Sequence, residues 1–168
     1  MDTHTKPNAR AQYLPLTLGV TCATRGALAA GLLVRVVLAW RRGGFVFPDE
    51  AWYFDLGQSL LERGIYRLSD EGTTRFAICV APGLPLLLAA VGLVIPLTPV
   101  GALLVNAVLG WLTVVVLVAL ARRWTGGWRA AAWMAAAGFH PAWVYLNITN
   151  YPQNAQGLAL ALLAWAVG

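Results

Sequence analysis

Long apolar stretches alternate with short polar ones along this chain, and the alternation predicts membrane helices. Asp, Glu, Lys and Arg are absent between Arg75 and Arg122, and again after Arg129. A soluble domain of this length cannot cover such stretches with a solvated surface, whereas a helix of about 20 apolar residues crosses a bilayer. The pattern therefore predicts an all-α integral membrane protein, a polytopic helical bundle, rather than a soluble domain.

The apolar stretches predict four complete spans and an incomplete fifth. The predicted spans are residues 21–40, 76–95, 100–121 and 130–146, with the incomplete one at 155–168. Pro96 and Pro99 mark the turn between the second and third spans, because proline interrupts a helix. The last stretch is too short to cross a bilayer about 30 Å thick at about 1.5 Å per residue. Residues 1–15 form a polar tail, and residues 1–168 are expected to be the N-terminal part of a longer membrane domain.

Residues 41–75 form the one large hydrophilic segment, the predicted first extracytoplasmic loop. Six of the seven acidic residues lie between Asp49 and Glu71. Pro48 with Asp49 is a helix start signal and Gly64 is a stop signal, so a helix is expected over residues 49–63. Its apolar residues recur at helical spacing with polar residues between them, which predicts an amphipathic helix lying on the membrane surface.

Composition and charge indicate which kinds of partner the chain can bind. The chain is 59% hydrophobic and 11% charged, with a formal net charge of +5. Arginines beside the predicted helix ends fit contact with lipid headgroups, whereas a basic stripe with interleaved aromatics, typical of nucleic-acid binding, is missing. The two cysteines, Cys22 and Cys79, lie in apolar segments without the spacing of a disulfide framework or a zinc site.

The sequence Phe47-Pro48-Asp49-Glu50-Ala51-Trp52-Tyr53 carries the strongest candidate chemistry. Two adjacent carboxylates directly follow the first predicted span. A carboxylate at the mouth of a membrane cavity can accept a proton from an attacking hydroxyl, or can help to hold a divalent metal. The alternative is structural: Asp49 caps the helix and Glu50 complements the positive end of its dipole.

Four features resemble the N-terminal portion of type-C glycosyltransferases, specifically the family-39-like group of protein O-mannosyltransferases and aminoarabinose transferases. The features are Arg35 within Leu33-Val34-Arg35-Val36-Val37, the acidic pair with its aromatic sequel up to Gly64, Ala81-Pro82-Gly83-Leu84-Pro85-Leu86-Leu87-Leu88, and Ala119-Leu120-Ala121-Arg122-Arg123-Trp124 followed by Gly126 and His140-Pro141. The resemblance covers about residues 28–165. The chain departs from the pattern where Ala81 and Leu84 replace a proline and an aromatic residue, and where Gln153 replaces an acid.

The resemblance implies a membrane enzyme that transfers a sugar from a polyprenyl-phosphate donor to an extracytoplasmic acceptor, in the cell membrane of a bacterium. It assigns the catalytic role first to Asp49 and then to Glu50. Arg35, Tyr53 and His140 are candidate substrate-binding residues, since arginine pairs bidentately with phosphate. No cofactor is firmly implied, although a divalent metal is possible, and the sugar and the acceptor stay open.

The same residues also have purely structural interpretations. Arg35 could extend to the membrane surface or pair with Asp49, and His140 could be a packed, hydrogen-bonded helix residue. The chain as a whole could be a non-catalytic membrane protein, such as a transporter fragment or an assembly partner. A transporter is expected to show charged or broken-helix sites in the middle of the membrane. The family places the N-terminus inside the cell. With four spans that orientation puts all five arginines beside the predicted helix ends outside, against the positive-inside rule: Arg41, Arg42, Arg122, Arg123 and Arg129.

Overall fold

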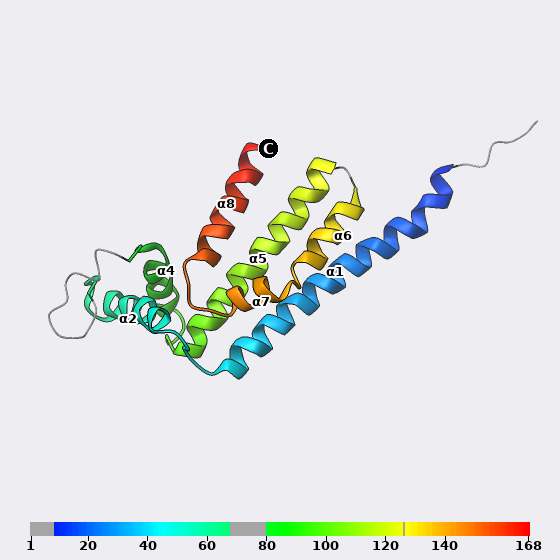
Figure 1. The fold of residues 1–168 in the computed structure, drawn as a ribbon. Coiled ribbons are helices and arrows are strands. Elements are labelled where there is room, and N and C mark those ends of the chain that lie inside the picture. Colours follow the sequence, from blue (N-terminus) through cyan, green and yellow to red (C-terminus); the bar gives the residue numbers. More distant parts are fainter. Residues whose placement is uncertain (1–8, 68–79, 126) are drawn as a thin grey trace, which may run out of the picture.

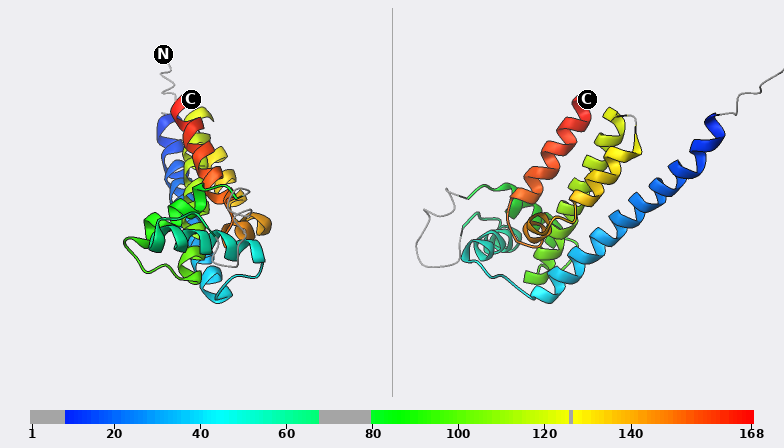
Figure 2. Two further views of the ribbon diagram at one scale, coloured as in Figure 1. Left: turned by 90° about the vertical axis from the view of Figure 1, so that its left-hand side faces the viewer. Right: turned by 45° about the vertical axis from the view of Figure 1, so that its right-hand side comes forward.

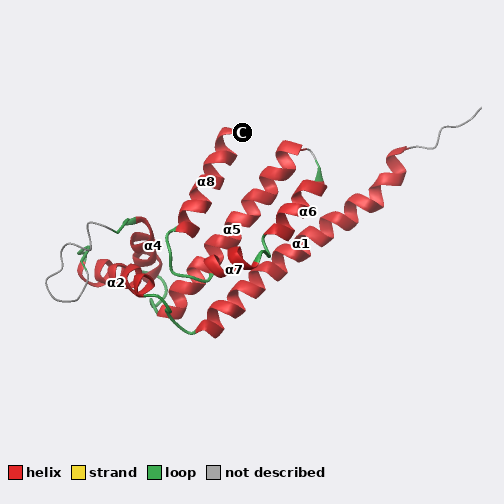
Figure 3. Cartoon of the chain, in the orientation of Figure 1, coloured by secondary structure: helices red, strands yellow, loops and turns green. Residues whose placement is uncertain are grey.

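In the computed structural model, which describes residues 9–67, 80–125 and 127–168, all regular structure is helical (Figures 1 and 3). The helices are α1 (Ala9–Arg42), α2 (Pro48–Arg63), α4 (Gly83–Gly92), α5 (Pro99–Thr125), α6 (Trp128–Ala137), α7 (Pro141–Asn147) and α8 (Gln153–Val167). The predicted all-α class is confirmed for this part of the chain.

Two of these helices are long and apolar enough to cross a membrane, judged by length and composition. They are Gly19–Arg42 within α1 and Pro99–Thr125, which is α5. The expectation of four complete spans is therefore met only in part. The second predicted span is replaced by the ten-residue helix α4, and the fourth is divided into α6 and α7.

The fourth predicted span breaks at residues 138–140. Pro141 begins α7, and proline disfavours helical backbone in the residue before it. His140 accordingly has φ −56° and ψ 127°, outside the helical region. Helix α6 packs against α1 and α5, and α7 continues beyond the break against α5 (Figure 1).

Helix α5 lies at the centre of the bundle, and α1 packs beside it in the opposite direction (Figure 1). Ala39, near the end of α1, packs in one apolar cluster with Leu103 near the start of α5. Further along, the Trp111 indole N–H donates to the Leu28 carbonyl over 2.9 Å. Helix α6 lies beside both, and α8 packs along α5 in the same direction as α5 (Figures 1 and 2).

This arrangement changes the expected distribution of charge between the two ends of the bundle. Because α5 starts beside the end of α1 and returns, Arg122, Arg123 and Arg129 lie at the end from which α1 enters, opposite Arg41 and Arg42. The four-span topology placed all five arginines at one end, which was wrong, since the missing second crossing reverses α5. Arg63, in the last turn of α2, lies at the same end as Arg41 and Arg42, so the described arginines are divided between the two ends of the bundle.

Helices α2 and α4 pack across the other end of the bundle (Figure 1). The predicted helix over residues 49–63 is confirmed, and it ends as expected at Gly64, whose φ of 67° is a left-handed conformation that favours glycine. Phe54 packs with Leu84 and Leu88 of α4. The apolar face of α2 is therefore covered by protein, not by lipid alone.

Large apolar side chains remain on the outside of the bundle. Among the most exposed are Leu93 at 78%, Val94 at 84% and Trp133 at 79%. A groove of about 390 Å³ between α4 and α5 is lined almost wholly by aliphatic residues. Such a surface fits an acyl-chain environment better than water.

Several predictions fall partly outside the described residues. The polar tail was expected over residues 1–15, but the backbone is already helical from Ala9. Residues 1–8, the end of the predicted loop at 68–75, Cys79 and the beginning of the second predicted span lie outside the described ranges. Cys22, the other cysteine, is exposed and free.

Candidate functional site

Glu50 is fully buried, and its carboxylate ties α2 to the rest of the bundle. One oxygen accepts hydrogen bonds from Arg42 Nη2 at 2.6 Å and from the backbone N–H groups of Val46 and Phe47 at 3.0 Å. The other accepts the Asn150 backbone N–H at 2.9 Å. Arg42, itself held by the Ile148 carbonyl, completes a buried ion pair with Glu50. Both carboxylate oxygens are therefore engaged inside the protein, and Glu50 holds the start of α2 against α1 and the loop before α8.

Asp49 stands in contrast to its neighbour. Its side chain is exposed, and among the described residues nothing donates a hydrogen bond to it or forms an ion pair with it. The N-cap position belongs to Phe47, whose N–H is satisfied by Glu50. The capping interpretation was therefore wrong for Asp49: the capping carboxylate is that of Glu50, three residues into the turn.

Aromatic rings gather beside Asp49. The Tyr53 and Tyr151 rings meet edge to face with centroids 6.3 Å apart, and Phe47 lies 6.5 Å from Tyr151. Burial, followed by the negative charge of Asp49, raises the pKa of the Tyr53 phenol. The same two causes, in the same order, raise the pKa of Tyr151. Both hydroxyls therefore stay protonated near neutral pH and can donate hydrogen bonds at this surface.

Arg35 lies inside the bundle and is only 1% exposed. Its Nε donates to Asn147 Oδ1 at 2.7 Å, Nη1 to the Gly31 carbonyl at 3.0 Å, and Nη2 to the Gly138 carbonyl at 2.6 Å. The guanidinium thus supplies a hydrogen-bond donor to the Gly138 carbonyl, which lies at the break between α6 and α7. Arg35 neither reaches the membrane surface nor pairs with Asp49, and its enclosure leaves no room for the donor phosphate that the sequence suggested.

We expect Arg35→Lys to lower stability by about 1–3 kcal/mol, because an ammonium cannot replace the planar fork and leaves buried acceptors unsatisfied. The measurement is thermal unfolding in detergent. Arg25→Lys, on the same helix but exposed, is the control and should change little. Equal melting of the Arg35→Lys variant and the wild type would show that the guanidinium fork does not hold the break.

A chain of buried amides connects Arg35 with Glu50. Asn147 donates to Asn154 Oδ1 at 2.7 Å, and Asn154 donates to Asn106 Oδ1 at 3.2 Å. Asn106 in turn donates to Asn150 Oδ1 at 2.9 Å, and Asn150 donates to the Glu50 carbonyl at 2.7 Å. These side chains come from α5, α7, α8 and the loop before α8. In the described residues, no buried side-chain polar atom lacks a partner.

Sequence reasoning missed this network. The signal was present, because Asn106 is the only amide side chain within the uncharged stretch 76–121, and residues 147–156 are polar without Asp, Glu, Lys or Arg. Interhelical amide hydrogen bonds are a common way for apolar helices to associate. Their pairing could not be derived, however, while α5 was thought to run in the opposite direction.

Gly110 makes room for one member of the network. A methyl group at this position would overlap the side-chain amide of Asn147. We expect Gly110→Ala to destabilise the protein by about 1–3 kcal/mol through overpacking. Gly157→Ala on α8 is the control, because its added methyl would meet Thr113 at an ordinary 3.7 Å. Thermal unfolding of both variants in detergent tests the expectation, which fails if Gly110→Ala melts no lower than Gly157→Ala.

The structure brings together only some of the predicted site residues. Asp49, Glu50 and Tyr53 share one end of the bundle, joined there by Tyr151. His140 is exposed at the break between α6 and α7, not packed within a helix as the structural alternative supposed. Among the described residues, no three His, Cys, Asp or Glu side chains gather as metal ligands. The possible divalent metal stays a prediction.

Comparison with known proteins adds no family. Neither protein-family models, nor curated proteins, nor solved structures gave a match to this chain.

Proposed function

We propose that the chain belongs to a membrane glycosyltransferase that uses a polyprenyl-phosphate sugar, with Asp49 as the base. The observation that carries the proposal is the contrast between two adjacent carboxylates. Glu50 is immobilised inside the protein, whereas Asp49 is held beside it with an open carboxylate. A base needs a free lone pair at a fixed position, and this pair of residues supplies both requirements.

The proposed reaction is a single displacement. The acceptor hydroxyl oxygen attacks the anomeric carbon and gives its proton to Asp49, while the bond from that carbon to the phosphate oxygen breaks. The electron pair leaves with the polyprenyl phosphate. Tyr53, kept protonated by burial and by the charge of Asp49, can donate a hydrogen bond to the sugar or the acceptor.

In this proposal the donor phosphate is bound by an arginine other than Arg35 or Arg42, because Arg35 is enclosed and Arg42 is paired with Glu50. Arg41, in the last turn of α1, is exposed and has no hydrogen-bonding partner among the described residues. We propose Arg41 for the phosphate contact, because arginine pairs bidentately with phosphate.

A transport function is the second candidate, because the broken helix and the buried Arg35 match what a transporter shows in mid-membrane. In this structure the guanidinium fills the break and is bound on all three nitrogens. A transport site would need Arg35 to exchange these contacts for a substrate. The open carboxylate at the membrane surface favours the transferase.

The test is donor turnover in membranes that contain the protein. Polyprenyl-phosphate mannose, glucose and arabinose are supplied in turn, and release of free polyprenyl phosphate is followed by mass spectrometry. Release from one donor, above that in membranes without the protein, supports the transferase. Absence of release from all three, together with uptake of a labelled solute by the same vesicles, supports the transporter.

A further inference from the structure

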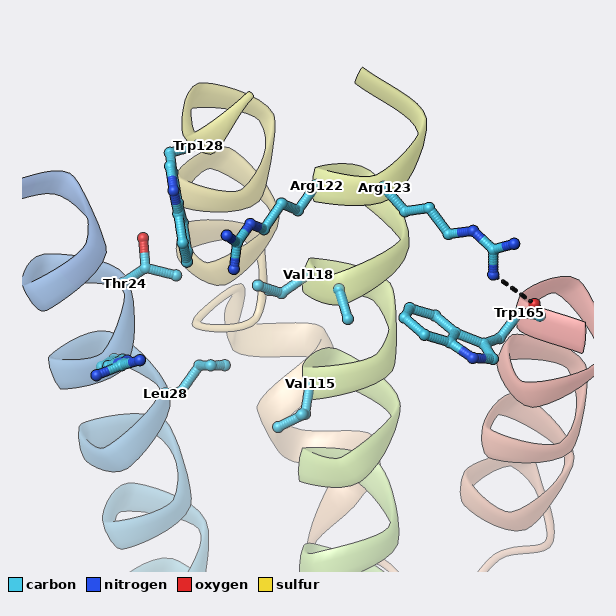
Figure 4. Close-up of a pocket in the computed structure, with 10 residues that line it drawn as sticks. Thr24, Leu28, Val115, Val118, Arg122, Arg123, Trp128 and Trp165 are labelled. Atoms are coloured by element: carbon cyan, nitrogen blue, oxygen red, sulfur yellow. Dashed lines mark hydrogen bonds between the residues drawn. The ribbon is translucent and has the colours of Figure 1, made fainter. Parts of the chain in front are cut away.

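An open cleft lined by apolar and basic side chains lies at the other end of the bundle, where α1, α5, α6 and α8 meet (Figure 4). It encloses about 630 Å³. Its apolar wall is formed by Leu28, Val115, Val118 and Ala119. Arg25, Arg122 and Arg123 supply the charge, with Trp128 and Trp165 beside them. No part of this cleft belongs to the Asp49 site.

Two of the three guanidinium groups are available to a ligand. Arg122 lies over the Trp128 ring at 3.9 Å from its centroid, which fixes its plane and leaves its N–H edges open. Arg25 and Arg122 have no hydrogen-bonding or ionic partner among the described residues. Arg123 is already engaged, because its Nη1 donates to the Trp165 carbonyl at 3.2 Å (Figure 4).

The cleft has no counter-charge from the described part of the protein. All acidic residues within the described ranges are on α2, which lies at the opposite end of the bundle. A bound anion would supply the missing counter-charge. Arg25 and Arg122 line the same cleft, so both side chains can take part in binding one anion.

We propose that this cleft binds the headgroup phosphate of an anionic phospholipid. The aliphatic wall continues from the arginines toward the middle of α5, so one acyl chain can follow Val118 and Val115 while the phosphate meets the guanidinium groups. Tryptophans beside the cleft occupy the headgroup level, where their amphipathic rings are favoured. A free inorganic anion would use the arginines but would leave the aliphatic wall uncovered.

The test is native mass spectrometry of the complete protein, released from detergent with phosphatidylglycerol or with phosphatidylcholine of the same acyl chains. We expect preferential retention of phosphatidylglycerol. Arg25→Gln and Arg122→Gln should each lower that retention by about fivefold, the effect of one basic residue at an anionic surface. Both positions are exposed, and circular dichroism verifies the fold of each variant.

Arg129→Gln is the matched control, because Arg129 is exposed at the same end but does not line the cleft. It should retain phosphatidylglycerol like the wild type, and glycerol phosphate in solution should not displace the lipid. The proposal is overturned by equal retention of the two lipids, by an equal loss in Arg129→Gln, or by displacement with glycerol phosphate. The result is independent of sugar transfer, since no residue of the Asp49 site is altered.

Discussion

Asp49→Asn is expected to lower the rate of sugar transfer by about 10²–10⁴-fold, the usual loss when a general base is removed. Asparagine keeps the size and polarity of the side chain and removes only its capacity to accept a proton. Because Asp49 is exposed and is not the N-cap, the melting temperature should hardly change. Release of polyprenyl phosphate from the accepted donor, measured per amount of inserted protein, gives the rate.

Two further substitutions sharpen this result. Asp49→Glu retains a carboxylate at a shifted position and should recover part of the activity, whereas Asp49→Ala should be as slow as Asp49→Asn. Asp55→Asn, six residues further along α2, is the control for a general loss of negative charge from this helix. Normal turnover in the Asp49→Asn variant removes Asp49 from the mechanism.

Glu50→Gln, in contrast, should mainly lower the stability. We expect a loss of about 3–5 kcal/mol, as is found when one member of a buried ion pair is removed. The amide cannot satisfy the site, because the wild-type carboxylate accepts from three backbone N–H groups and from Arg42. In either orientation the NH₂ group of glutamine would face other donors. Thermal unfolding in detergent measures the loss.

Glu62→Gln is the matched comparison for that experiment, since Glu62 is on the same helix and exposed. It should melt like the wild type. If Glu50→Gln also melts normally and loses only turnover, then Glu50, not Asp49, carries the reactive charge. The two variants therefore distinguish a catalytic role from a structural one, because Asp49→Asn should lower the transfer rate and Glu50→Gln should lower the stability.

Local signals in the sequence were sufficient to predict α2 and α5. Pro48 and Gly64 bounded α2 correctly, and the uncharged run up to Arg122 gave α5. The direction of α5 could not be derived, because hydropathy alone does not distinguish a ten-residue apolar helix such as α4 from a segment that crosses the membrane. Because one crossing too many was predicted there, the predicted direction of every later helix was reversed.

At the candidate site, too, the sequence indicated individual residues but not the distant residues that contact them. The motif directed attention to the adjacent carboxylates, but their separate roles depend on Asn150 and Arg42, which approach Glu50 from different parts of the chain. Arg35 was identified as unusual from its place in an apolar span. Its partners, Gly138 and Asn147, are defined only once α6, α7 and α1 are packed together.

The contacts of Arg35 also bear on how the protein is made. Its acceptors on Gly138 and Asn147 are 103 and 112 residues further along the chain. At a synthesis rate of about 5–20 residues per second, Gly138 leaves the ribosome roughly 5–20 s after Arg35. During that interval the Arg35 guanidinium has one of its three partners, the Gly31 carbonyl of its own helix. Charges inside a membrane are costly unless they are paired, so we expect the first helix to reach its full stability only when the later helices have packed against it.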